Sequence, residues 1–185
     1  MTTSILAIRK FEAPNPDAEV LGYGLSALGE SITRAEFEHM LDKYGLTEID
    51  PQAWYPLQTL LDMYAEMDED KSRSMQYFVS IGMKVVHVIP EHIASIPEAL
   101  DFLNAALAGS MRHYAVDTYN YRIETVEEGH ARVIDYTPFP HDLIYGYMYA
   151  IANTFSGEGR SPTVVRTYLN EDDPDSDGAV YDIQW

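Results

Sequence analysis

The sequence predicts one α+β domain, in which N-terminal helices pack with an antiparallel sheet of two hairpins around a central helix (ββαββ). Helical periodicity dominates residues 31–110, whereas residues 111–185 contain two strand pairs separated by an apolar helix. Residues 1–30 hold scattered prolines and glycines, and we expect them to form an extended entry segment. A single domain over 1–185 is therefore expected, and this length is sufficient to bury a core.

Two helices are expected in the first half of the helical part. The first begins at Thr33, whose hydroxyl forms a capping box with Glu36, and ends near Tyr44-Gly45. The second begins at Trp54-Tyr55-Pro56, where proline is tolerated in the first turn, and carries leucines at helical spacing.

A third helix, over residues 72–87, has the clearest amphipathic pattern in the chain. Gly82 lies on its apolar face, which indicates that another backbone approaches there. A fourth helix begins with a capping box of Ser95 and Glu98 and ends at Gly109.

The pattern then changes to strands. Residues 114–126 and 132–136 are rich in β-branched and aromatic side chains and predict one hairpin, with its turn at 127–129. Residues 163–169 and 179–185 predict the second hairpin.

The central helix, residues 143–155, is apolar on nearly every side and must be covered on both faces. We expect the sheet to cover one face, and the early helices, a second subunit or a bound ligand to cover the other. Tyrosines suit an apolar pocket because their hydroxyls orient a ligand. The residues expected to line such a pocket are Tyr145, Met148, Tyr149, Phe78 and Met83.

Composition limits the partners. The chain has 30 acidic and 12 basic residues, a net charge of −18, and no cysteine. This charge repels phosphate backbones and anionic lipids, so we expect neither nucleic-acid nor membrane binding. Thiolate metal sites and disulfides are excluded. Neither an export signal nor an apolar span is indicated, so a cytoplasmic location is expected.

The succession Tyr-Thr-Pro-Phe-Pro-His-Asp-Leu-Ile-Tyr-Gly at 136–146, a helix, and a hairpin ending Gly-Ala-Val-Tyr-Asp-Ile-Gln-Trp at 178–185 resembles the 4-vinyl reductase-like small-molecule-binding domains. These belong with the haem-nitric-oxide-binding and Golgi-transport domains in one superfamily. The resemblance implies a sensor or scaffold domain, often dimeric. Relatives often carry cysteines before the helix and in the last hairpin, where this chain has His141, Ala179 and Tyr181.

No metal site or cofactor is expected, with haem and calcium kept as alternatives. Residues 173–178 reproduce the opening D-x-D-x-D-G of a calcium loop, but Gln184 stands where an EF-hand needs glutamate. For haem, His92 and His113 are candidate ligands, but the Y-x-S-x-R pattern of the haem-binding relatives is absent. No catalytic motif is found either, and His141-Asp142 point apart on a helix, so we expect no enzyme.

The sequence thus favours a non-catalytic ligand-binding or sensory domain that takes a small hydrophobic molecule into an aromatic-lined cavity. The alternative is a structural or adaptor subunit that uses the same apolar helix surface for dimer or partner contacts. A homodimer is expected under either hypothesis.

Overall fold

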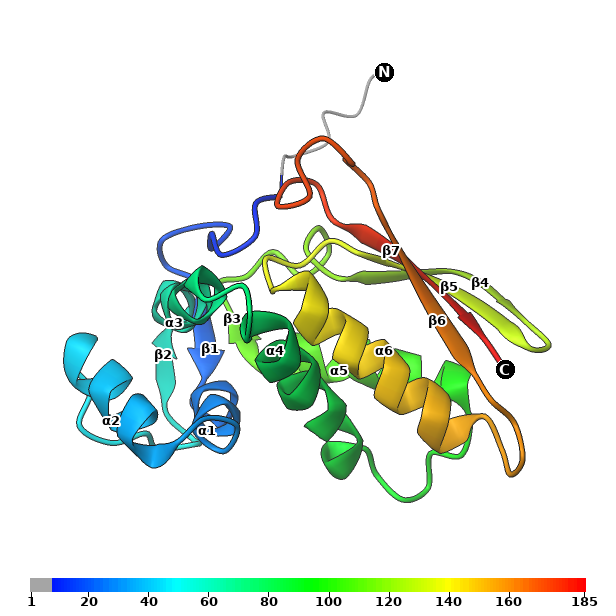
Figure 1. The fold of residues 1–185 in the computed structure, drawn as a ribbon, viewed down its shortest axis with the longest axis horizontal. Coiled ribbons are helices and arrows are strands. Elements are labelled where there is room, and N and C mark those ends of the chain that lie inside the picture. The colour runs from blue at the N-terminus through cyan, green and yellow to red at the C-terminus, as the bar shows by residue number, and fades with distance from the viewer. Residues whose placement is uncertain (1–7) are drawn as a thin grey trace.

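The structure is a computed structural model that describes residues 8–185. Figure 1 shows two ends of the molecule, which we call the helical end and the sheet end. The helical end contains β1 (Glu19–Leu21), α1 (Tyr23–Gly29), α2 (Arg34–Lys43), β2 (Trp54–Pro56), α3 (Leu57–Glu69) and β3 (Met111–Arg112). The sheet end contains α4 (Ser74–Met83), the 3₁₀ helix η1 (Lys84–Val88), α5 (Ile96–Gly109), β4 (Tyr121–Glu127), β5 (His130–Asp135), α6 (His141–Phe155), β6 (Thr163–Tyr168) and β7 (Ala179–Gln184).

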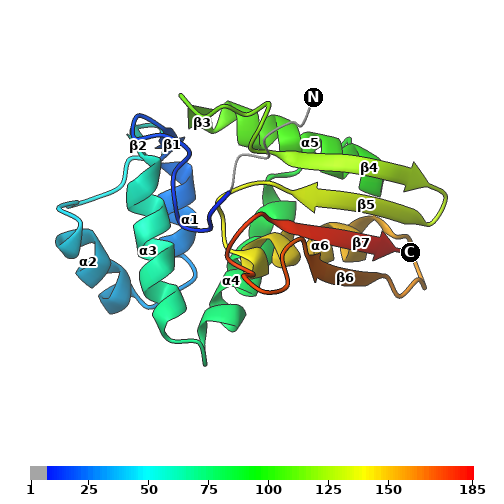
Figure 2. The ribbon, with the colours of Figure 1, turned by 90° about the horizontal axis from the view of Figure 1, so that it is seen from above.

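The predicted α+β class and the ββαββ order are confirmed. The two hairpins join into one antiparallel sheet with the strand order β4-β5-β7-β6, which Figure 2 shows from above. At its centre Val133 pairs with Tyr181, and both side chains are fully buried. The inward face of β7 also buries Ile183, so the aromatic and apolar alternation of the last strand supplies the core.

Helix starts follow the predicted capping chemistry. The Glu36 amide donates to Thr33 Oγ1 at 3.3 Å, and the Thr33 amide donates to Glu36 Oε2 at 3.0 Å, so the capping box is complete. The Glu98 amide donates to Ser95 Oγ at 3.4 Å at the start of α5. Both caps satisfy amides that a helix start would otherwise leave unpaired.

The N-terminal third differs most from the prediction. Residues 1–7 of the expected entry segment lie outside the described residues, but 19–29 form β1 and α1. Trp54–Pro56 pair with β1 as strand β2, so the second helix begins at Leu57 instead of Trp54. These strands are only three residues long, too short for alternation to reveal them.

Other boundaries shift as well. The third predicted helix ends at Met83 and continues as η1 to Val88. The strand expected from residue 114 begins at Tyr121, after a turn at 115–119. Within the described chain, no helix is long and apolar enough to cross a membrane.

The central helix α6 lies between the sheet and α4 (Figure 1). Gly82 of α4 meets Gly146 of α6, where a Cβ built on Gly82 would lie 2.2 Å from the Leu143 carbonyl oxygen and 2.9 Å from Gly146 Cα. The predicted close backbone approach at Gly82 is therefore confirmed. Sheet and helix cover both faces of α6, so its apolar surface is mainly core.

We predict that Gly82→Ala destabilises the protein. The added methyl group overlaps the α6 backbone, and the two helices must separate, which costs about 1–3 kcal/mol of unfolding free energy. Urea unfolding followed by circular dichroism measures the change.

The matched control is Gly109→Ala at the end of α5, where a Cβ would meet nothing within 4 Å. This variant should be neutral, or more stable by up to about 1 kcal/mol, because alanine is the better helix former. Equal stability of the two variants would contradict the close crossing.

Candidate functional site

A cavity of about 330 Å³ lies where the helical end meets the sheet end. Its walls come from β1, α1, α3 and β3 on one side and from α4, η1, α5, β4 and α6 on the other. This volume falls within the range of small-molecule sites. The aliphatic and phenylalanine side chains of the lining include Val20, Leu21, Leu60, Ile81, Val88, Phe102, Leu103, Leu107, Phe139 and Leu143.

Tyrosines supply most of the polar atoms of the lining. Tyr64 and Tyr121 are nearly inaccessible, and Tyr147 is half-buried. Burial, together with neighbouring tyrosines, raises the pKa of all three phenols well above the ordinary value of 10. They are therefore neutral at physiological pH and can donate hydrogen bonds.

The mouth of the cavity is marked by exposed lining residues. Tyr23 is 51% exposed and Val88 is 40% exposed. Beside them, Lys84 Nζ donates to the Glu30 carbonyl oxygen at 2.8 Å and to Ser31 Oγ at 2.8 Å. Lys84 therefore joins η1 to the end of α1 across the mouth.

The five residues expected to line a pocket lie elsewhere. Phe78 is buried edge-on against Tyr64, with ring centroids 5.6 Å apart, and Met148 is fully buried. Met83 is exposed, and Tyr145 stacks on Tyr149 at 6.2 Å on the half-buried side of α6. The cavity lining includes none of them, so their role as ligand contacts stays a prediction.

The cavity is lined by Leu143 and Tyr147 of α6, and not by the pocket residues expected on this helix, Tyr145, Met148 and Tyr149. Its remaining walls come from short elements, such as β1 and η1, that carry little periodicity. One signal was available in the sequence: Tyr147 introduces a hydroxyl into an otherwise apolar helix face.

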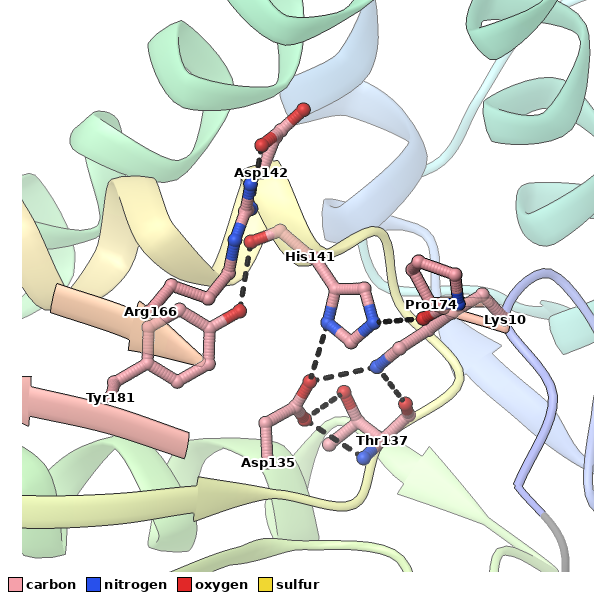
Figure 3. Close-up of polar contacts among 8 residues, drawn as sticks. All are labelled: Lys10, Asp135, Thr137, His141, Asp142, Arg166, Pro174 and Tyr181. Atoms are coloured by element: carbon pink, nitrogen blue, oxygen red, sulfur yellow. Dashed lines mark hydrogen bonds and ion pairs between the residues drawn. The ribbon is translucent and has the colours of Figure 1, made fainter. Parts of the chain in front are cut away.

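A second polar feature is a buried ion pair between Lys10 and Asp135 (Figure 3). Lys10 Nζ donates to Asp135 Oδ2 at 2.8 Å and to the Thr137 carbonyl oxygen at 2.7 Å. The other carboxylate oxygen accepts from the Thr137 amide and hydroxyl, at 2.8 and 2.7 Å. Burial lowers the pKa of the Lys10 amine, while the attraction of Asp135 opposes the shift. Lys10 and Asp135 are 125 positions apart, so no local sequence pattern predicts that they form an ion pair.

His141, at the start of α6, lies beside the Lys10–Asp135 ion pair and completes this buried polar cluster (Figure 3). Its Nε2 lies 2.7 Å from the Pro174 carbonyl oxygen, which can only accept, so Nε2 carries the proton. Nδ1 lies 3.9 Å from Asp135 Oδ2 and has no hydrogen-bond partner among the described residues. Burial, and then the positive charge of Lys10, lower the pKa of His141 to about 4.

The Asp173–Asp177 loop, which resembles the start of a calcium loop, has a structural role in this cluster. Besides the Pro174 contact, the Asp175 carbonyl accepts from the Lys10 amide at 2.9 Å. Across residues 8–185, no three His, Asp or Glu side chains are grouped so that they could hold a metal ion.

Asp142 does not act with His141. Its carboxylate accepts from Arg166 at 2.6 Å and faces away from the buried cluster (Figure 3). The predicted divergence of these neighbouring side chains is thus seen in the structure, and Asp142 also lies in the first turn of α6, where the helix dipole favours a negative charge.

We predict that His141 makes the protein acid-sensitive. Its folded pKa of about 4 lies below the unfolded value of about 6.5, so on acidification the unfolded chain takes up the proton first. The stability contributed by neutral His141 is complete above pH 6.5 and is lost as the pH falls towards 4, by about 3 kcal/mol.

Urea unfolding at a series of pH values, on wild type and His141→Gln, checks this prediction. Glutamine keeps a donor for the Pro174 carbonyl but does not titrate, so the wild-type stability should fall more steeply between pH 6.5 and 4. Parallel curves for the two proteins would refute the role of His141, because all other titrating groups are shared.

Comparison with known proteins identifies the fold. No family model and no curated protein sequence matches the chain. Among solved structures, an H-NOX family structure from work on haem distortion has a TM-score of 0.61 at 10% identity. The match covers 89% of this chain and 92% of that chain. A T. tengcongensis H-NOX variant has a TM-score of 0.62 at 12% identity, covering 88% and 93%. An oxygen-binding H-NOX domain related to soluble guanylate cyclases gives 0.56 at 9% identity, covering 88% and 91%.

These neighbours correct the expectation of no cofactor, because the structures that share the fold belong to haem-binding domains. At 9 to 12% identity the likeness concerns the fold alone, and none of these neighbours is a 4-vinyl reductase-like domain.

The residues of this chain do not fit a haem held in the usual ways. Haem iron is bound through histidine, cysteine, methionine or tyrosine. The chain has no cysteine, and none of its six histidines lines the cavity. Met111 lines it but has no histidine beside it, which is the usual companion of a methionine ligand. The four tyrosines of the lining have raised pKa values, mainly because of burial, and this disfavours the phenolate that binds iron. His92 and His113, the candidates from the sequence, lie outside the lining as well. The cavity volume of about 330 Å³ lies at the lower end of the range of small-molecule sites. The chain therefore has the fold of the H-NOX domains with a cavity lining of its own.

Proposed function

We propose that this protein is a ligand-binding sensory domain that takes a small hydrophobic molecule into the cavity between its two ends. The observation that carries the proposal is the cavity itself, about 330 Å³ in volume and lined mainly by aliphatic and aromatic side chains. An apolar ligand of matching size would gain free energy by leaving water, because the lining offers little competing polarity.

The mechanism is a shift between two packings. A ligand in the cavity touches Tyr23 and Leu60 of the helical end and Leu143 and Tyr147 of the sheet end at the same time. The ligand favours the relative placement of the two ends to which it binds more tightly. The size of the population shift between the two placements is set by the difference in ligand affinity. The role is non-catalytic, and the lining contains no acid or base side chain beyond Lys84 and the tyrosines.

Two of the five residues predicted from the sequence, Phe78 and Met148, have a place in this proposal as a second layer. Phe78 packs behind Tyr64, and Met148 lies on the helix that carries Tyr147, so a ligand that moves either tyrosine would act on them indirectly. Homodimer formation and a cytoplasmic location are part of the proposal and rest on the sequence alone.

Native mass spectrometry of protein from cells supplied with haem precursor tests the proposal most directly. A retained small apolar molecule would support it, and the absorbance spectrum shows whether the retained molecule is haem, which would contradict the cavity lining as the ligand site. Protein that retains nothing, and that also binds no apolar compound in calorimetric titration, would refute a ligand-binding role.

We predict that filling the cavity blocks binding. Ala106 on α5 lines the cavity, and in Ala106→Phe the ring takes up part of its volume. The affinity for an uncharged apolar probe, 1-decanol, should fall about tenfold, which corresponds to about 50 Å² of lost apolar contact. Isothermal titration calorimetry measures it.

Ala105→Phe is the matched control. Ala105 is the preceding residue on α5, is exposed, and does not line the cavity, so the substitution has the same helix-propensity cost without filling space. Decanol affinity should be unchanged in this variant. If both variants bind decanol like wild type, the probe does not occupy this cavity.

A further inference from the structure

Lys84 is the one charged side chain in the cavity lining. The rest of the lining contains no Asp, Glu, Arg or His, and its buried tyrosines are neutral because burial raises their pKa. Lys84 is half-buried at the mouth, with its aliphatic stem beside the apolar wall. The cavity is thus apolar inside and carries a single positive charge at its entrance.

The partners of Lys84 leave that charge uncompensated. Its Nζ donates to the Glu30 carbonyl oxygen and to Ser31 Oγ, which are both neutral acceptors. Among the described residues, no carboxylate lies within ion-pair distance of it, although the chain carries 30 acidic residues. An ammonium group has three donors, so one is available for an incoming acceptor.

From this arrangement we infer that the ligand is an apolar molecule ending in a carboxylate, with Lys84 pairing with the carboxylate at the mouth and the apolar body inside. The inference rests on the proposed function and narrows it to one chemical class. The cavity volume of about 330 Å³, at the lower end of the range of small-molecule sites, suits the alkyl chain of a medium-chain carboxylic acid.

Decanoate and 1-decanol are suitable probes, because they share the alkyl chain and differ in the charged end. Calorimetric titration of the full chain at low ionic strength gives both dissociation constants. In Lys84→Met the affinity for decanoate should fall about fivefold relative to the affinity for decanol, the size expected of a partly exposed ion pair. Lys84→Arg keeps the charge and should restore most of the decanoate affinity.

Two controls separate this role from a structural one. Lys43→Met removes an exposed lysine that pairs with Glu66 on the helical end, outside the cavity, and should leave both probes unaffected. Unchanged decanol binding in Lys84→Met shows that the cavity is intact. If that variant is unfolded, Lys84→Gln replaces it, since the amide can still donate to the Glu30 carbonyl without carrying a charge.

The outcomes are distinguishable. If wild type binds both probes and Lys84→Met loses no decanoate affinity relative to Lys43→Met, the carboxylate inference is wrong and the hydrophobic cavity stands. If wild type binds neither probe, both this inference and the cavity as a ligand site fail for this chemical class. A decanoate-specific loss in Lys84→Met that Lys84→Arg reverses supports the inference.

Discussion

The contact on which the rest of the structure depends is the crossing of α4 over α6 at Gly82 and Gly146. Each glycine faces the backbone of the other helix, and a Cβ on Gly146 would lie 2.5 Å from the Val79 carbonyl oxygen. Because the helices meet so closely, α6 is enclosed between α4 and the sheet over most of its length. The same crossing sets where α4 ends, and therefore where η1 places Lys84 against the end of α1.

Local patterns in the sequence predicted the sheet-end architecture because the relevant signals lie within single elements. The amphipathic third helix, the capping box of Thr33 and Glu36, the Ser95 cap and the two hairpins all appear in the structure. The cavity was less predictable, since its walls come from elements spread from Val20 to Tyr147. The apolar surface of α6 indicated burial on both sides, but it could not show which side faced empty space. The Lys10–Asp135 ion pair could not be predicted from the sequence either, because it forms only when the folded chain brings two distant segments together.

The comparison with H-NOX structures separates what a fold determines from what its residues determine. The fold is shared at identities of only 9 to 12%. The chemistry of that space belongs to the individual chain, because one fold commonly hosts different sites. Here the lining offers phenols and one ammonium group instead of a histidine. A correct fold assignment is therefore compatible with a different ligand, and the lining is the better guide to which one.

The overall charge of the protein adds a kinetic constraint on such a ligand. A net charge of −18 repels an approaching carboxylate and lowers the rate of encounter at low salt. At physiological salt this repulsion is screened beyond about 8 Å, whereas the contact with Lys84 is made at close range and is screened less. Affinity should then depend on the apolar body and on the local charge, and the acidic surface should affect mainly the association rate. A preference of about fivefold for an anionic over a neutral molecule of the same shape can therefore come from one lysine, even on a highly acidic protein.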